Sequence, residues 1–152
     1  MKFLRLVAAV IICELAGIIG SVFTIQNIPG WYAYLNKPSF NPPNYLFGPV
    51  WTTLYLLMGI AVFLVWENKN RTGRALIVFF VQLALNACWT LIFFGLKSPG
   101  WAFVEIVALW IMIVWCIVEF RGISKTAAYL LIPYLLWVSY ASVLTFSIWK
   151  LN

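Results

Sequence analysis

The sequence lacks histidine, and only 9% of its 152 residues are charged. Without histidine, imidazole ligation of haem or metal ions and acid–base catalysis by imidazole are excluded. Soluble domains carry about 25% charged residues, whereas this chain is 64% hydrophobic with a mean hydropathy of +0.97. We therefore predict an integral membrane protein that forms a single domain over residues 1–152.

Several motifs of soluble chemistry are also missing. The sequence has no glycine-rich phosphate loop, no nucleophile–base pair and no CxxC spacing. The odd number of cysteines inside apolar runs predicts small buried side chains at Cys13, Cys88 and Cys116. We predict no metal site, no resident cofactor and no conventional catalytic constellation. Because the basic residues flank apolar runs and form no stripe, the net charge of +6 indicates membrane topology and no nucleic-acid partner.

Long apolar runs dominate the chain, and each is long enough to cross a bilayer as a helix. The predicted fold is all-α, a bundle of five transmembrane helices over about residues 4–25, 45–66, 75–96, 101–120 and 125–149. The basic start of the first run resembles a signal peptide, but its length favours a retained helix. Ser124 is a predicted N-cap of the fifth helix, and Pro133 should kink that helix near its middle.

The charges at the ends of these runs predict the orientation. With five spans, one side of the membrane collects seven basic residues and the other has only Lys37, Lys97 and Lys150. By the positive-inside bias, the N-terminus is cytoplasmic, and the first loop and the C-terminus lie outside. The seven basic residues of the N-terminal side are Lys2, Arg5, Lys69, Arg71, Arg74, Arg121 and Lys125.

The segment from Trp31 to Trp51 differs from the rest of the chain because it combines four prolines with many aromatic residues. Proline fixes φ and lacks an N–H, so this segment resists both a regular helix and a sheet. A long loop in a compact protein is usually functional or a disordered linker, and the aromatic content argues against a linker. We predict that the loop over about residues 26–44 is a structured cap on one end of the bundle.

Two features mark the first helix. Small residues recur every four positions at Ala9, Cys13, Gly17 and Ser21, which favours close helix packing either within the chain or in a homodimer. Glu14 lies near the middle of this run, where a charged carboxylate facing lipid is costly. It should therefore face the bundle interior or be protonated.

Helical periodicity places chemically distinctive residues on single faces of three later helices. On the second helix the face of Trp51 and Tyr55 is typical of core packing. On the third, Gln82, Asn86 and Trp89 recur at helical spacing, and their amides need partners at membrane depth. Those amides either join helices or bind a polar group of a ligand. The fifth helix presents one more such face, with Tyr134, Trp137 and Ala141, continued by Leu144.

Several blocks of sequence together resemble the translocator protein family, also called TspO/MBR, tryptophan-rich sensory protein or peripheral benzodiazepine receptor. These blocks are WYAYLNKPSFNPP, GPVWTTLYLLMG, QLALNACWTLIFFG, GWA, PYLLWVSYASVL and SIWKLN, and they run in order from about residue 20 to the C-terminus. The resemblance implies a five-helix bundle that often dimerises. It also implies a pocket beneath the first loop that binds porphyrins such as protoporphyrin IX, sterols in eukaryotes, and synthetic ligands.

Matching the family's motifs to this chain gives a candidate ligand-binding set. Its wall would come from Trp51, Asn86, Trp89, Trp101, Trp137, Ala141 and Leu144, with Ser21, Thr24 and Phe47 at matching positions of the first helix and loop. We add three residues that share helix faces with this set: Tyr55, Gln82 and Tyr134. The family's sterol motif needs a tyrosine where this chain has Phe146, so that motif is incomplete here.

Three functions follow from the resemblance and the composition. The first is a receptor or carrier for porphyrins and similar flat hydrophobic molecules, in a sensory or tetrapyrrole-handling role. Indole rings suit such a guest, because they offer stacking faces and an N–H donor, and Lys37 could meet a carboxylate at the membrane surface. The second is light-dependent porphyrin degradation, for which Trp51 and Trp137 match tryptophans implicated in bacterial relatives. The third is a structural partner of other membrane proteins that binds no ligand.

Overall fold

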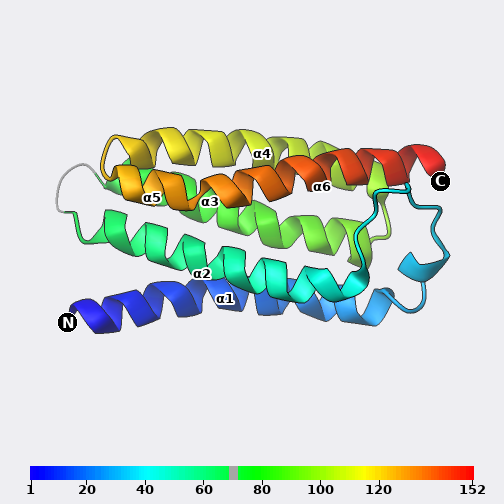
Figure 1. Ribbon diagram of the computed structural model, residues 1–152, viewed down its shortest axis with the longest axis horizontal. Coiled ribbons are helices and arrows are strands. Elements are labelled where there is room, and N and C mark those ends of the chain that lie inside the picture. The colour runs from blue at the N-terminus through cyan, green and yellow to red at the C-terminus, as the bar shows by residue number, and fades with distance from the viewer. Residues whose placement is uncertain (69–71) are drawn as a thin grey trace.

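The structure, a computed structural model, describes residues 1–68 and 72–152 as a bundle of long helices that run side by side (Figure 1). The described residues contain no β-strand. The helices are α1 (Lys2–Asn27), α2 (Phe47–Trp66), α3 (Gly73–Thr90), α4 (Pro99–Arg121), α5 (Lys125–Leu130) and α6 (Ile132–Leu151). A π-helical turn, Leu91–Gly95, continues α3, and a 3-10 turn, Asn44–Leu46, precedes α2.

Five of the helical segments are long and apolar enough to cross a membrane: Lys2–Asn27, Asn44–Trp66, Gly73–Gly95, Pro99–Arg121 and Lys125–Leu151. The predicted five-helix bundle is thus confirmed, with each boundary within two residues of its expected place. The agreement is close because a bilayer demands long apolar runs and because proline, glycine and polar residues interrupt them.

Both local predictions for the last span concern its first third. The Ser124 hydroxyl accepts a hydrogen bond from the Ala127 backbone N–H at 3.2 Å, which confirms it as the N-cap. The helix is interrupted at Leu131, between α5 and α6, and Pro133 lies in the first turn of α6. Proline removes one backbone bond and crowds the preceding turn, so the predicted disturbance is present, although nearer the start of the span than its middle.

The small-residue ridge of α1 packs inside the chain. Ala9 and Cys13 are buried, and a Cβ on Gly17 would lie 2.5 Å from the Tyr55 ring of α2. Further along the same contact, a Cβ on Gly59 would lie 2.6 Å from the Val10 Cα. Close backbone approach of α1 and α2 therefore uses up this ridge. A homodimer stays a prediction, and another surface would have to form its interface.

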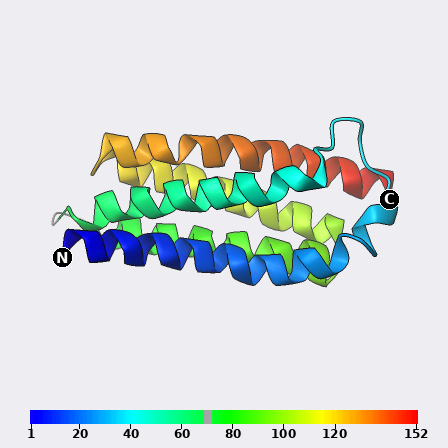
Figure 2. The ribbon, with the colours of Figure 1, turned by 60° about the horizontal axis from the view of Figure 1, so that its bottom comes forward.

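The proline- and aromatic-rich loop is folded over one end of the bundle, next to the C-terminus (Figure 2). Asn36 and Asn152 exchange hydrogen bonds, with the Asn36 N–H donating to Asn152 Oδ1 at 3.1 Å and Asn152 Nδ2 donating to Asn36 O at 2.9 Å. The Tyr140 hydroxyl of α6 donates to the Phe40 carbonyl oxygen. The loop is thus a cap attached to α6 at two places.

The opposite end of the bundle carries the N-terminus and two ion pairs (Figure 1). Arg5 pairs with Glu67 at 2.8 Å, and Arg74 pairs with Glu119 at 3.0 Å. The N- and C-termini lie at opposite ends, as an odd number of spans requires. Lys69 and Arg71, which contribute to the predicted charge asymmetry, lie outside the described residues.

One prediction about the cysteines is wrong. Cys13 and Cys116 are buried as expected, but Cys88 is exposed on the outer side of α3. An apolar run that crosses a membrane has a lipid-facing side as well as a buried one, so a position inside such a run does not establish burial within the protein.

Candidate functional site

A cavity of about 410 Å³ lies in the half of the bundle beneath the cap. Its lining comes from α1, α2, α3, α4, α6 and the loop, and includes Tyr32 of the loop. Exposed residues of α1 and of the start of α2, among them Ile18, Ile25 and Gly48, also line it. The cavity therefore opens between these two helices, beyond the point where Gly17 contacts Tyr55.

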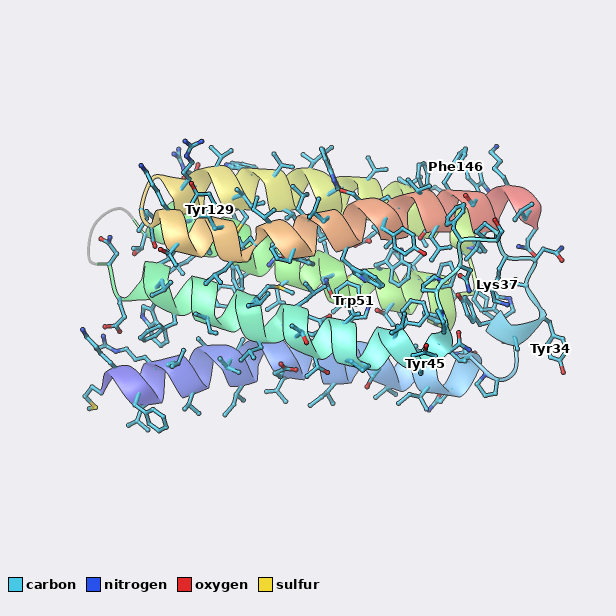
Figure 3. The ribbon with its side chains drawn as sticks, in the orientation of Figure 1. Tyr34, Lys37, Tyr45, Trp51, Tyr129 and Phe146 are labelled. Carbon is cyan, nitrogen blue, oxygen red and sulfur yellow. The ribbon has the colours of Figure 1, made fainter. Side chains whose placement is uncertain are left out.

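Aromatic side chains form much of the wall. Trp51 of α2 lies edge-on to Tyr134 at a centroid distance of 6.4 Å, and its place midway along the bundle is visible in Figure 3. On α6, Trp137 lies edge-on to Phe47 at 6.4 Å. Trp89 of α3 stacks on Phe93 at 5.0 Å with an interplanar angle of 16°. These rings give the cavity flat apolar surfaces on three sides.

A chain of buried hydrogen bonds forms the floor. The Tyr55 hydroxyl donates to Asn86 Oδ1, Asn86 Nδ2 donates to the Tyr134 oxygen at 2.8 Å, and the Tyr134 hydroxyl donates to Gln82 Oε1 at 2.7 Å. All four side chains are buried. The chain joins α2, α3 and α6 and satisfies polar groups that lipid could not satisfy. Only Tyr55 and Asn86 of the four reach the cavity surface.

Most hydroxyls on the wall already have partners. Ser21, Thr24 and Thr145 donate to carbonyl oxygens of their own helices, at 2.7, 3.2 and 2.7 Å respectively. Trp89 differs, because its indole Nε1 is buried and has no hydrogen-bond acceptor among the described residues. A buried donor without an acceptor costs about 1–3 kcal/mol. A guest that offers an acceptor to Trp89 would recover this loss.

Two carboxylates of the spans lie in different places. Glu14 of α1 is half-buried and lines the cavity, on the side where α1 meets α2. Glu105 of α4 does not line it, and both its carboxylate oxygens are buried without a hydrogen-bond partner in the described part of the chain.

The cavity brings together ten of the thirteen predicted ligand-binding residues. They are Ser21, Thr24, Phe47, Trp51, Tyr55, Asn86, Trp89, Trp137, Ala141 and Leu144. Gln82 and Tyr134 lie outside the lining, in the layer of hydrogen bonds beneath it. Lys37 does not reach the cavity either, because its ammonium group lies 4.7 Å from the centroid of the Tyr32 ring and donates to Leu35 O at 3.2 Å.

Trp101 does not line the cavity, contrary to its predicted place in the wall. Its side chain is 71% exposed near the start of α4, whereas the next residue, Ala102, is fully buried. The inward face of α4 is occupied by Ala102, Ile106 and Leu109. Trp101 precedes that face by about 100° of helix rotation and points outward, at a membrane end where tryptophan is commonly enriched.

Several lining residues were not predicted. Thr90 follows Asn86 by one helical turn, and Tyr140 follows Trp137 by three residues. Extending the helical faces of Asn86 and Trp137 by one turn would have found both. Tyr32 of the cap carries no such signal, because the loop has no period that sets its direction.

These features define a class: a helical membrane protein with an aromatic cavity inside the bundle and a loop that caps it. The chain matches the TspO/MBR family over residues 9–150. It is 46% identical to the tryptophan-rich protein TspO of Archaeoglobus fulgidus, over 100% of this chain and 99% of the relative. It is 38% identical to the translocator protein of Homo sapiens, over 88% of this chain and 82% of the relative.

A third relative is the tryptophan-rich sensory protein of Cereibacter sphaeroides, 37% identical over 80% of this chain and 77% of the relative. The chain belongs to the TspO/MBR family and is an integral membrane protein with several spans. Among the described residues no cluster of three or more cysteine, aspartate or glutamate side chains could hold a metal ion.

Proposed function

We propose that this protein is a membrane receptor or carrier that binds porphyrins, such as protoporphyrin IX, and similar flat hydrophobic molecules in the cavity under the cap. The observation that carries the proposal is an aromatic cavity in which the Trp89 N–H has no acceptor. The volume of about 410 Å³ lies within the usual range of small-molecule sites. A sensory or tetrapyrrole-handling role fits such binding.

The chemistry of a porphyrin matches this wall in two respects. Its ring is a wide apolar disc, for which Trp51, Trp89 and Trp137 offer stacking or edge contacts from three helices. Its two carboxylates lie on one edge, and such acceptors could take the Trp89 N–H. The opening between α1 and α2 would let one edge of a guest larger than the cavity remain outside.

Titration with protoporphyrin IX in the dark tests the proposal. The purified protein should show saturable quenching of tryptophan fluorescence, and Trp89→Phe should bind more weakly because phenylalanine keeps an aromatic ring but loses the N–H. Trp101→Phe is the matched control, since Trp101 lies outside the cavity and its loss should leave affinity unchanged. An absence of saturable quenching would refute porphyrin binding and favour the structural-partner function.

A second candidate function, light-dependent porphyrin degradation, is favoured by one observation: Trp51 and Trp137 both line the same cavity. An excited porphyrin can take one electron from an indole and pass it to dioxygen, which leaves an indole radical cation and superoxide beside the macrocycle. The superoxide and its products would then oxidise the ring. This route needs bound porphyrin, light and dioxygen, and it needs no acid–base residue.

Illumination of the porphyrin complex distinguishes the two functions. Loss of the porphyrin absorption band in light would support degradation, and quenching without that loss would support binding alone. In the double variant Trp51→Phe and Trp137→Phe, quenching by the guest should remain while breakdown is largely lost, because phenylalanine is much harder to oxidise than indole. Each single variant should lose nearly as much, since residues acting on one guest are non-additive. Breakdown at the wild-type rate in the double variant would mean self-photolysis of porphyrin.

For the orientation, we propose that the N-terminus is cytoplasmic and that the cap and the C-terminus lie outside. The support is the excess of basic residues at the N-terminal end, including Lys2, Arg121 and Lys125. A cysteine introduced at Lys37 should react with an impermeant reagent from outside intact cells, whereas one at Arg121 should not. The reverse labelling pattern would overturn this orientation.

A further inference from the structure

A second, smaller hollow lies near the end of the bundle that carries the N-terminus. It has a volume of about 140 Å³ and is bounded by side chains of α1, α2 and α3: Ala9, Ile12, Cys13, Val62, Trp66, Leu76, Phe79 and Phe80. We call it the N-terminal crevice. In Figures 1 and 2 the first turns of α1 lie beside the last turns of α2, and the crevice lies next to this contact.

The crevice has a buried floor and a rim that faces the surrounding membrane. Cys13 and Phe79 are fully buried at its floor, whereas Ile12, Trp66 and Phe80 are each more than 40% exposed. All of its lining side chains are apolar apart from the indole N–H of Trp66 and the thiol of Cys13. Water gains nothing in so apolar a space. In a bilayer, hydrocarbon chains of lipid are the molecules at hand to fill it.

Hydrocarbon alone gives no selectivity, because lipid chains are as apolar as the helices. A charged group at the outer end of the crevice supplies it. Arg5 lies one helical turn before Ala9 on the same face of α1, and its guanidinium carbon is 6.0 Å from the centroid of the Trp66 ring. Its Nη1 pairs with Glu67 at 2.8 Å, yet the Arg5 side chain is 48% exposed.

A guanidinium has five N–H donors, so a pair through Nη1 leaves donors for a second oxyanion. Lys2 precedes Arg5 by three residues, nearly one turn of the same helix, and adds positive charge at this end. An acyl chain in the crevice would place its head group at the level of Arg5, because Arg5 lies directly beyond the end of the hollow. Basic pockets between helices on the cytoplasmic side commonly bind anionic lipid head groups.

From these contacts we propose that the N-terminal crevice holds an acyl chain of an anionic phospholipid whose phosphate is bound by Arg5. Glu67 competes with the phosphate for the same guanidinium and so sets the strength of binding. The site is separate from the cavity under the cap, since the two share no lining residue.

Spin-labelled phospholipids in bilayers containing the protein measure this site directly. The motionally restricted fraction should be larger for phosphatidylglycerol than for phosphatidylcholine, by about fivefold in relative association constant. High salt should reduce this preference, because the Arg5 end is exposed. An equal restricted fraction for both lipids at low salt would overturn the proposal.

Three charge variants separate a lipid site from a structural ion pair. Arg5→Gln should abolish the preference for phosphatidylglycerol, whereas Glu67→Gln should increase it, because Glu67 no longer competes for Arg5. If the pair were purely structural, both variants would have the same effect. Arg121→Gln is the matched control, since Arg121 is exposed at the same end but belongs to α4, which does not line the crevice. A loss of preference in Arg121→Gln equal to that in Arg5→Gln would reduce the effect to general surface charge.

Filling the crevice tests the acyl-chain half of the proposal. Ile12→Trp places a larger side chain at the partly exposed rim and should lower the restricted fraction of both lipids by about one chain per protein. Ile19→Trp is the control, because Ile19 is exposed on the same helix and lines neither hollow. If Ile12→Trp and Ile19→Trp behave alike, no acyl chain occupies the crevice.

Discussion

The two halves of the bundle use the same kinds of residue differently. In the half near the N-terminus, glycine and aromatic residues bring helices together: a Cβ on Gly59 would lie 2.6 Å from Val10, and Phe79 stacks on Phe120 at 5.8 Å. In the half beneath the cap, a Cβ on Gly48 would meet nothing within 4 Å, and the aromatic residues stand around a cavity. The first half holds the helices together, and the second leaves room for a guest.

This difference arises because α1 and α2 approach each other at two glycines and then separate. Gly59 and Gly17 sit at the close contact, and beyond Gly17 the cavity opens between the two helices. In lipid, association of helices depends on close packing and internal hydrogen bonds rather than on hydrophobic burial. A cavity is therefore tolerated only where other contacts, here the Tyr55–Asn86–Tyr134–Gln82 chain and the cap, hold the helices.

The largest expected effect is on the close contact of α1 and α2. Gly59→Leu should lower the free energy of unfolding by about 3 kcal/mol or more, because overpacking a contact between backbones forces them apart. Gly48→Ala, on the same helix, should leave stability unchanged or slightly raised, since the position is open and alanine favours helix. Thermal unfolding followed by circular dichroism in detergent compares the two. Equal losses would remove the contrast between the halves.

The layer between the halves should respond in two separable ways. Asn86→Leu and Gln82→Leu should each cost about 1–3 kcal/mol of stability, since each leaves a buried tyrosine hydroxyl short of a partner. Only Asn86 lines the cavity, so only Asn86→Leu should also weaken porphyrin binding, by roughly tenfold. Dissociation constants from fluorescence quenching check this. Unchanged affinity in Asn86→Leu would make Asn86 a helix-joining residue alone.

A smaller effect is expected at the cap. Tyr140→Phe removes the hydrogen bond to the Phe40 carbonyl oxygen and should speed both association and dissociation of porphyrin, by up to about fivefold. Tyr129→Phe is the control, because Tyr129 is exposed at the opposite end of the bundle (Figure 3). Stopped-flow quenching gives both rates. If dissociation is unchanged in Tyr140→Phe, the cap does not limit access to the cavity.

The smallest effect concerns pH. Burial raises the pKa of Tyr32 above its usual value of 10.0, while its hydrogen bond to Asn41 acts in the opposite direction. Because the neutral phenol is favoured in the folded state, its contribution to stability is present below about pH 10 and is lost as the pH rises through the raised pKa. The unfolding midpoint should therefore fall less steeply above pH 10 in Tyr32→Phe than in the wild type. Identical slopes would show that Tyr32 stays neutral without cost.

The sequence by itself determined the number and limits of the spans, the presence of a structured cap, and most of the cavity wall. Span length follows from bilayer thickness, so long apolar runs suffice to define it. The polar face of α3 was also readable, because lipid offers amides no partner and Gln82 and Asn86 therefore had to point inward. The TspO/MBR resemblance then supplied the residues of the other helices that meet around Asn86.

Only the tertiary structure decided which apolar faces meet. Trp101 and Cys88 point outward, and Gln82 and Tyr134 lie beneath the cavity, although nothing in their hydrophobic pattern distinguishes them from lining residues. Likewise, Gly59 makes a close contact and Gly48 none. The reason is physical: in a membrane both the outer and inner faces of a helix are apolar, so hydrophobic period does not fix its rotation. Packing against neighbouring helices fixes it.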